Sequence, residues 1–457
     1  MSQLKEKLSR FLKENPIFSR FLKNSGYMFS SSTISVGLVA VQSILAASLL
    51  GKSQLGLITL AISSVTTINQ IFSFRMGEFV IRFFTKAKEE HGLEHAKAVI
   101  KSSIFIESVT SILAFIFLIL IAPVAAPLFV TDFDPALLSP LIQLFGISIL
   151  ANLFTETANG VLRVTNHYKT QAAIGLIHSI LTFSIITLAF IFKWGFLVVL
   201  LAYLVGKIFI GVSPMLMALR VMPREFGSGW WKTRISILTS AKEMARFVVS
   251  TNLSGTIKQL SNESEGLWIG LFIDESAVGL YKVAMSVANL LTIPITPFIQ
   301  TAFPEITRCA ISKKWAQLRK LLRQITLLAS AWTIPATLFL VIFGKWILTY
   351  IYTPEFEYTS AFIPMIILLA GYAFTNIFFW NRSLLLSFGK ANIPLLVLAV
   401  GGILKMALTL VVVPVYGING EAALLSAYFI LTTGVMILIG YTVIKKSETL
   451  EPEIEAA

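Results

Sequence analysis

Charged side chains recur at helical spacing inside long apolar stretches of this sequence. Arg75, Glu78 and Arg82 lie three or four residues apart in one such stretch, a spacing that places them on one face of a helix. Arginine offers a phosphate group bidentate, charge-assisted hydrogen bonds. Because Glu78 neutralises only part of the charge, the stripe predicts a positively charged surface that binds anions. Arg82 is nearer the end of the stretch, where its side chain can instead extend to the membrane surface.

A second and longer polar stripe extends from Glu243 to Glu265. Its members recur every three or four residues: Glu243, Arg246, Ser250, Ser254, Lys258, Asn262 and Glu265. Ionisable groups at membrane depth usually face a cavity or a partner. We therefore expect this face to line a substrate cavity, with packing against neighbouring helices as the alternative. Arg246 and Lys258 would then supply positive charge. The polar groups beside them would be Ser250, Ser254 and Asn262.

A third stripe of the same spacing consists of Asn152, Glu156, Asn159 and Arg163. Two roles stay open for Glu156: a site for a proton or a coupling ion, or the partner of a neighbouring arginine. The same two roles are open to Glu78. Asn152 and Asn159 would add polar groups to the cavity.

Two lysines, Lys207 and Lys405, lie near the middle of further apolar segments. Each is a candidate cavity cation, because a lysine at that depth must reach water or bind backbone carbonyls. No catalytic or metal-binding pattern accompanies these charges, since the sequence has no HExxH, CxxC or P-loop. We expect neither an enzyme nor a cofactor. A Na⁺ or H⁺ gradient would supply the energy, although the sequence does not identify the ion.

The segments that carry these residues indicate an all-α polytopic membrane protein. Of the 457 residues, 56% are hydrophobic and 13% are charged, whereas soluble domains carry about 25% charged residues. A helical crossing needs about 20 apolar residues, so the chain can hold roughly a dozen. Transmembrane barrels are excluded, because long unbroken apolar runs replace short alternating strands.

Twelve apolar segments can be read. They are Ser25–Leu50, Leu55–Phe84, Ile100–Phe129, Leu138–Arg163, Thr170–Phe192, Gly195–Leu219, Glu243–Phe272, Val278–Glu305, Leu321–Tyr350, Ser360–Ser387, Ile393–Val415 and Ile418–Ile444. Polar residues make the seventh segment the least certain. Removing it would place the basic loop Arg308–Arg323 outside the cell, against the rule that cytosolic loops carry the excess of lysine and arginine.

The charges of the connectors alternate between basic and weakly basic or acidic throughout the chain. This alternation predicts a cytoplasmic-membrane protein with both termini in the cytosol. It also explains the formal charge of +13 better than nucleic-acid binding does. Residues 1–24 read as an amphipathic segment on the cytosolic surface, and residues 445–457 as an acidic cytosolic tail.

The two halves of the chain resemble each other at an offset of 223 positions. Ser53-Gln54-Leu55-Gly56-Leu57 corresponds to Ser276-Ala277-Val278-Gly279-Leu280, and Val161-Leu162-Arg163 to Leu384-Leu385-Leu386. The repeat predicts a lobe of helices 1–6 at 25–219, a cytosolic connector at 220–242 and a lobe of helices 7–12 at 243–444. Parallel repeats of this kind are typical of transporters with a substrate site between the halves. Chance similarity between apolar helices is the alternative. In the eighth segment, Pro294, Pro297 and Pro304 predict kinks.

From about Lys23 to Lys446, the chain resembles the polysaccharide flippases of the multidrug/oligosaccharidyl-lipid/polysaccharide (MOP) exporter superfamily. The motifs that carry the resemblance are Leu49-Leu50-Gly51, Leu55-Gly56-Leu57, Val278-Gly279-Leu280-Tyr281-Lys282-Val283-Ala284 and Phe303-Pro304-Glu305. The resemblance implies two six-helix lobes around a cavity lined by the first, second, seventh and eighth helices. It thereby favours Arg75, Arg246 and Lys258 over Lys207 and Lys405 as substrate-binding cations.

The resemblance also implies the cargo: an isoprenoid-diphosphate-linked oligosaccharide moved from the inner to the outer leaflet by alternating access. Flippases of the peptidoglycan precursor carry charges in the first helix, where this chain has Ser30, Ser31, Ser32 and Thr33. An O-antigen, capsule or similar repeat unit is therefore the preferred cargo. The protein is expected to act as a monomer beside a glycan polymerase or export complex.

Two alternatives remain. A multidrug or toxin exporter of the same fold would need buried carboxylates for cationic drugs, which Glu78 and Glu156 could provide. A non-transporting membrane scaffold of a glycan-assembly complex would have no use for polar cavity stripes.

Overall fold

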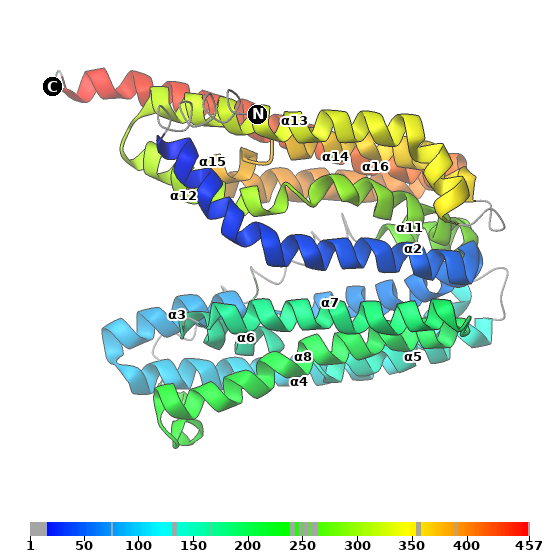
Figure 1. The fold of residues 1–457 in the computed structure, drawn as a ribbon. Coiled ribbons are helices and arrows are strands. Elements are labelled where there is room, and N and C mark those ends of the chain that lie inside the picture. The colour runs from blue at the N-terminus through cyan, green and yellow to red at the C-terminus, as the bar shows by residue number, and fades with distance from the viewer. Residues whose placement is uncertain are drawn as a thin grey trace, which may run out of the picture. The chain divides into compact units, whose positions relative to one another are not determined.

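The computed structural model describes the backbone of residues 16–74, 76–129, 135–165, 167–237, 243–245, 249, 256, 264–352, 358–388, 390 and 392–455. Every regular element in these ranges is helical (Figure 1). The chain divides into two compact units. One comprises Val41–Val283, and the other comprises Met1–Ala40 together with Ala284–Ala457.

The α-helices are α2 (Pro16–Phe72), α3 (Met76–His91), α4 (Leu93–Ala125), α5 (Pro135–Leu150), α6 (Thr155–Val164), α7 (Tyr168–Ile191), α8 (Phe196–Phe226), α10 (Glu265–Phe272), α11 (Glu275–Asn289), α12 (Thr296–Ile311), α13 (Trp315–Trp346), α14 (Phe362–Ile377), α15 (Asn381–Ser387) and α16 (Asn392–Glu455). Short 3-10 turns are η1 (Ala126–Leu128), η2 (Trp230–Lys232), η3 (Ile235–Ile237), η4 (Leu290–Thr292) and η7 (Tyr358–Ala361). A π-helical turn, η5 (Ile347–Ile351), extends α13.

Within the described ranges, eight helical stretches are long and apolar enough to cross a membrane. Two of them, Gly37–Lys88 and Asn392–Thr449, have 52 and 58 residues and each overlap two predicted segments. The eight stretches therefore account for ten of the twelve predicted segments. The seventh lies mostly outside the described residues. The eighth is divided between α11 and α12, with a break that includes Pro294, whereas α12 continues through Pro304.

The two longest helices change direction at a glycine rather than in a loop. Gly51 interrupts α2 with φ 72° and ψ 173°, and Gly417 interrupts α16 with φ 61° and ψ −145°. Glycine adopts positive φ without steric cost, unlike residues with a Cβ atom. The predicted connectors after the first and eleventh segments are therefore reduced to a single non-helical residue each.

Replacing Gly417 by alanine is expected to destabilise the protein by about 1–3 kcal/mol, because alanine would be strained at these backbone angles. Gly434 in the same helix is the matched control, since a Cβ atom there would meet open space and its φ is not positive. Gly434→Ala should leave stability unchanged or raise it, because alanine favours helix. Thermal unfolding in detergent measures the stability of both variants. Equal melting temperatures would contradict the conclusion that the backbone at position 417 requires glycine.

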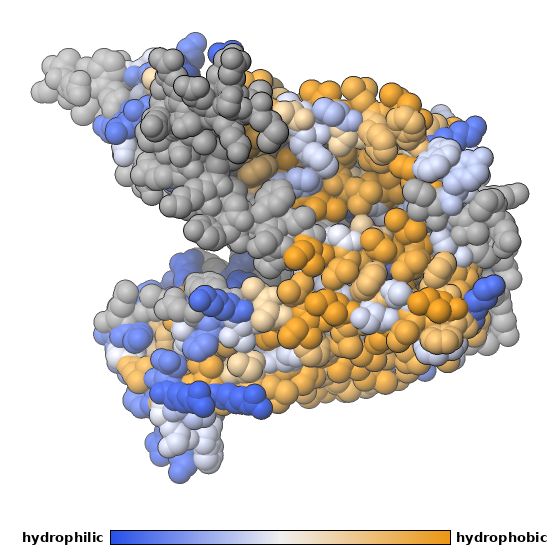
Figure 2. Space-filling view, viewed as in Figure 1, coloured by the Kyte–Doolittle hydropathy of each residue, from blue (hydrophilic) through white to orange (hydrophobic). Residues whose placement is uncertain are grey.

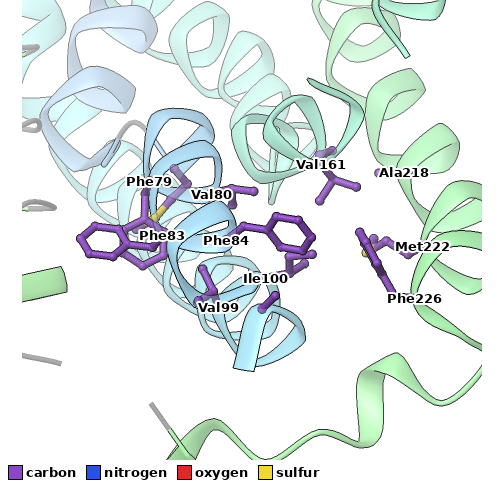
Figure 3. Packing of buried hydrophobic residues seen from close by; sticks show 14 of the residues in the cluster. Phe79, Val80, Phe83, Phe84, Val99, Ile100, Val161, Ala218, Met222 and Phe226 are labelled. Atoms are coloured by element: carbon purple, nitrogen blue, oxygen red, sulfur yellow. The ribbon is translucent and has the colours of Figure 1, made fainter. Parts of the chain in front are cut away.

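In the unit Val41–Val283, helices α3 to α8 pack alongside one another (Figure 1). Figure 3 shows the apolar core where α3, α4, α6 and α8 meet. Phe79, Phe83 and Val161 in this core are at most 1% exposed. On the face drawn in Figure 2, apolar residues cover the helical middle of this unit and hydrophilic residues gather at one end of its helices. Leu120 of α4 is 70% exposed, as expected of a side chain that faces lipid.

In the other unit, α13 and α16 pack against α14, and α15 packs against both α12 and α16. Trp380 is fully buried in the core of this unit, and its indole N–H donates a hydrogen bond of 2.7 Å to the hydroxyl of Thr326. It belongs to a non-helical turn, 378–380, that separates α14 from α15. The tenth predicted segment is thus divided into a long and a short helix.

The fourth predicted segment is divided in the same way. Its helices α5 and α6 are separated by the turn 151–154. The short helices α6 and α15 contain the sequences Val161-Leu162-Arg163 and Leu384-Leu385-Leu386, which the repeat aligns. These two short helices end at Val164 and Ser387, 223 positions apart, whereas the turns before them are separated by three to four positions more than that offset.

Candidate functional site

The Arg75–Glu78–Arg82 stripe begins at a break in a helix. α2 ends at Phe72 and α3 begins at Met76, and the described residues between them are not helical. Arg75 itself lies outside the described residues. Glu78 and Arg82 are both exposed on the first turns of α3. Non-helical backbone at membrane depth is tolerated where it is covered by protein or lines a cavity.

The break in the fourth segment is stabilised by local hydrogen bonds. The side-chain amide of Asn152 donates to the carbonyl of Ser148 at 2.6 Å and accepts from the Thr155 hydroxyl at 3.3 Å. That hydroxyl also lies 2.9 Å from the carbonyl of Gly211 on α8. Asn152, a predicted cavity residue, therefore has a structural role at the break.

A buried carboxylate from α4 caps the helix that follows this break. Glu107 is 6% exposed, and its Oε1 accepts the backbone N–H of Glu156 at 2.8 Å. Its Oε2 accepts the N–H of Thr157 at 2.8 Å and the Thr157 hydroxyl at 2.6 Å. The first N–H groups of a helix lack intrahelical partners and carry a partial positive charge. Glu107 therefore satisfies the first N–H groups of α6.

Helix α6 lies against α3 through a pair of glycines. A Cβ atom on Gly160 would lie 3.0 Å from the carbonyl oxygen of Gly77. A Cβ atom on Gly77 would lie 3.0 Å from the carbonyl oxygen and 3.1 Å from Oε2 of Glu156. This close approach places Glu156 beside the start of α3, the helix that carries Glu78. Both carboxylates are exposed, and the two residues predicted for ion coupling or ion pairing belong to helices that pack against each other.

The other predicted polar residues are distributed differently. Asn159 accepts a hydrogen bond of 2.8 Å from the side-chain amide of Gln171. Its polar side chain therefore has a partner within the unit Val41–Val283. Five members of the second stripe lie outside the described residues, namely Arg246, Ser250, Ser254, Lys258 and Asn262. The described ends of that stripe are Glu243, which is exposed, and Glu265, which is 2% exposed.

Glu243 joins the start of the predicted seventh segment to the end of the second. Its two carboxylate oxygens lie 3.0 Å from Lys86 Nζ and 3.4 Å from Arg82 Nη2. All three side chains are at least 39% exposed. Ion pairs in such surroundings contribute about 0–1 kcal/mol. The contact can therefore form and break at little cost in free energy.

The two predicted lysines in the sixth and eleventh segments have different surroundings. Lys207 is exposed on α8. Lys405 on α16 is buried, and its Nζ lies 2.8 Å from Glu421 Oε1. The hydroxyl of Thr409 lies 3.2 Å from the other carboxylate oxygen of Glu421. Lys405 thus has a protein carboxylate as its partner, where the sequence predicted a cation for the substrate.

Two residues of this arrangement were missed by the sequence analysis. Glu107 is the only acidic residue in the predicted segment Ile100–Phe129, and its solitary position in an apolar run was the available signal. Glu421 lies near the start of the predicted segment Ile418–Ile444 and in helix α16, and an acidic residue inside an apolar segment was again the available signal. In the described ranges, no group of three or more His, Cys, Asp or Glu side chains could hold a metal ion.

Comparison with solved structures reveals the same fold in two transporters. The inward-facing conformation of a multidrug resistance MATE family transporter of the MOP superfamily superposes with a TM-score of 0.75 at 14% identity, over 94% of this chain and 99% of that chain. The lipid II flippase MurJ, in an inward closed conformation, gives a TM-score of 0.68 at 16% identity, over 90% of this chain and 87% of MurJ. The fold is thus an all-helical polytopic membrane fold with about 12 crossings, as predicted.

Sequence comparisons identify the family. The Inner membrane protein YghQ of Escherichia coli (strain K12) is 22% identical over 298 residues, which cover 64% of this chain and 81% of YghQ. The model of the MatE family matches residues 253–411. The model of the family described as Polysaccharide biosynthesis protein matches residues 21–310, more than half of the chain. The chain therefore belongs to the polysaccharide biosynthesis protein family, within the MOP superfamily of transporters.

Proposed function

We propose that this protein is a flippase that moves an isoprenoid-diphosphate-linked oligosaccharide from the inner to the outer leaflet of the cytoplasmic membrane. The observation that carries the proposal is the match to the polysaccharide biosynthesis family across residues 21–310 in a chain with a transporter fold. MurJ, which shares the fold, is itself named a flippase of a lipid. Alternating access would expose the cavity to one leaflet at a time.

The proposed location is the inner membrane, with both termini in the cytosol. YghQ is named an inner membrane protein, and the alternation of basic connectors supports this orientation. The cargo would be handed to a glycan polymerase or export complex on the outer side. The protein would flip its cargo as a monomer.

In this proposal, Arg75, Arg246 and Lys258 bind the diphosphate of the cargo. A diphosphate is a dense anion, and guanidinium groups bind it with paired hydrogen bonds. Lys405 is a weaker candidate than the sequence suggested, because the charge of Glu421 balances its own. Glu78 and Glu156 would bind the coupling ion, Na⁺ or H⁺, or balance the arginines.

Arg75→Ala, Arg246→Ala and Lys258→Ala are each expected to lower glycan export while the folded protein persists in the membrane. The reason is the loss of one cationic contact to the diphosphate in each variant. Surface glycan and membrane-inserted protein are measured in cells that carry each variant. Lys320→Ala, which removes an exposed charge from α13, is the control and should export normally. Full surface glycan in all three cavity variants would refute the assignment of these residues.

A multidrug exporter is the second candidate, and the match of residues 253–411 to the MatE family favours it. The two functions are separated by reconstituting the protein in vesicles with either a cationic dye or a fluorescent isoprenoid-diphosphate disaccharide. A flippase moves the disaccharide and leaves the dye, whereas an exporter does the reverse. Collapsing the Na⁺ and H⁺ gradients in turn identifies the coupling ion, and transport insensitive to both would rule out coupling.

A further inference from the structure

The connector that follows α8 is held against the first turns of α4. Lys101 Nζ donates a hydrogen bond of 2.9 Å to the carbonyl oxygen of Thr233. The Thr233 hydroxyl donates a bond of 3.0 Å to Glu94 Oε2, and Lys97 Nζ lies 2.7 Å from the other oxygen of that carboxylate. Figure 1 shows the connector at the end of the unit Val41–Val283 where α3 turns into α4. These bonds give the connector a defined place at this end of the helices.

The connector presents one of its two adjacent tryptophans on the surface. Trp230 packs against the apolar core shared by α3, α4, α6 and α8, whereas Trp231 is 56% exposed. Lys232 Nζ lies 5.3 Å from the centre of the Trp231 ring. Tryptophan is enriched where membranes meet water, because its ring is apolar and its N–H can bond to polar groups. The position of Trp231 therefore suits the headgroup region of a bilayer.

An exposed stripe on α8 joins apolar to basic side chains beside this connector. Leu219, Arg220 and Arg224 follow Leu216 by three, four and eight positions, a spacing that places all of them on one helical face. Leu216 and Leu219 are 53% and 43% exposed, as expected of side chains that face lipid. The two arginines are exposed as well and lie nearer to the connector, which contacts α8. Long basic side chains at the end of a crossing reach the lipid headgroups in this way.

The charge of this region is strongly positive. Between positions 216 and 237 the chain has four basic residues and one acidic residue, Glu225. Basic residues next to a membrane attract anionic lipids, and a guanidinium group binds a phosphate with paired hydrogen bonds. We call the exposed aromatic and basic side chains of this region the connector surface, which consists of Arg220, Arg224, Trp231, Lys232 and Arg234.

We propose that the connector surface binds the phosphate headgroup of an anionic phospholipid, such as phosphatidylglycerol, from the adjoining leaflet. The arginines hold the phosphate, Trp231 lies at the level of the headgroup, and Leu216 and Leu219 contact the acyl chains. In the proposed orientation this is the cytosolic leaflet. The site is separate from any cavity for cargo, and its occupant is a lipid of the membrane rather than a transported molecule.

Quenching of Trp231 by brominated lipids tests the proposal. The purified protein is reconstituted in phosphatidylcholine vesicles that contain either brominated phosphatidylglycerol or the same amount of brominated phosphatidylcholine. Because the chain has eight tryptophans, Trp231→Phe is measured in parallel, and the difference between the two proteins gives the quenching of Trp231 alone. Brominated phosphatidylglycerol is expected to quench Trp231 more strongly. Equal quenching by the two lipids would overturn the proposal, and so would the absence of quenching by either.

Variants of the arginines test whether their charge selects the lipid. Changing Arg220, Arg224 and Arg234 together to glutamine should remove the excess quenching, because affinity falls about fivefold for each basic residue lost near the membrane surface. Changing the same three residues to lysine keeps the charge and should retain most of the excess. An excess that persists in the glutamine variant would refute the proposal. Its loss in the lysine variant would also refute it.

Two basic residues of the other unit serve as the control for net charge. Lys320 and Arg323 are exposed on α13, and changing both to glutamine removes charge at a distance from Trp231 along the chain. The excess quenching of Trp231 by phosphatidylglycerol should be the same as in the unchanged protein. A loss as large as that in the arginine variant would mean that overall charge, and not the connector surface, attracts the lipid.

A competition distinguishes a membrane lipid from the proposed cargo, which also contains phosphate. An isoprenyl diphosphate is added to the vesicles at about one tenth of the amount of brominated phosphatidylglycerol. Trp231 is expected to stay quenched. Recovery of its fluorescence would assign the connector surface to the cargo and overturn the proposal. None of these measurements requires transport, so their failure would leave the proposed function standing.

Discussion

Glu421→Gln is expected to lower the free energy of unfolding by about 3–5 kcal/mol, because it removes the carboxylate that balances the buried charge of Lys405. The two side chains are 3% and 0% exposed, and their charged atoms are 2.8 Å apart. They lie on opposite sides of the kink at Gly417 in α16. Thermal unfolding of the purified protein in detergent measures the loss. Because the pair stabilises the packing of two crossings, the amount of protein in the membrane should fall as well.

Two further variants distinguish the effect of the buried charge imbalance on stability from other effects of the substitution. Lys405→Met together with Glu421→Leu should recover most of the lost stability, since apolar residues of similar volume often replace a buried ion pair without cost. Arg319 and Glu448 form an exposed pair in the same unit, with side chains 48% and 40% exposed. Glu448→Gln should therefore change stability by at most about 1 kcal/mol. A double variant as unstable as Glu421→Gln would show that the charge imbalance does not cause the loss of stability.

Glu107→Ala is expected to have the next largest effect, because it strands the N–H groups of Glu156 and Thr157 at the start of α6. Each buried donor without an acceptor costs about 1–3 kcal/mol. The variant should melt at a lower temperature and export less glycan, since α6 also carries Glu156. Glu107→Gln should be intermediate, because the amide retains only one acceptor oxygen.

Ser103→Ala is the control for Glu107. The Ser103 hydroxyl contacts only the hydroxyl of Thr157 among the hydrogen bonds described for it, at 2.7 Å, and its loss should cost about 1 kcal/mol. Melting temperatures and export are compared for the three variants. If Glu107→Ala behaves like Ser103→Ala, the carboxylate does not cap α6, and the break in the fourth crossing has another cause.

The sequence predicted the crossings well because hydropathy depends on local composition. The charge of the connectors also predicted that the polar seventh segment crosses the membrane. Pro294 lies at the observed break in the eighth segment. The breaks at 73–74 and 151–154 could not be predicted, because neither contains a proline and each lies inside a predicted apolar segment. The second break is stabilised by Glu107, a residue from another helix, and such a contact leaves no signal in the local pattern.

The candidate site was less predictable than the fold for the same reason. Spacing along the chain places Glu78 and Glu156 on helix faces, but only the packing of Gly77 against Gly160 brings the two helices together. For Lys405, hydropathy gave the depth of the side chain and not its partner. Glu421 is 16 residues away and comes within reach only because the chain reverses at Gly417 instead of in a loop.

The cap formed by Glu107 has a consequence for how the chain enters the bilayer. As an isolated helix, the third crossing would carry a carboxylate into lipid, at a cost of about 2.5–3.5 kcal/mol for an acidic residue near the centre. The groups that satisfy this carboxylate belong to the fourth crossing. The third crossing therefore gains its final stability only after the fourth has been synthesised. During biogenesis, these two crossings should leave the translocon as a helical hairpin rather than one at a time.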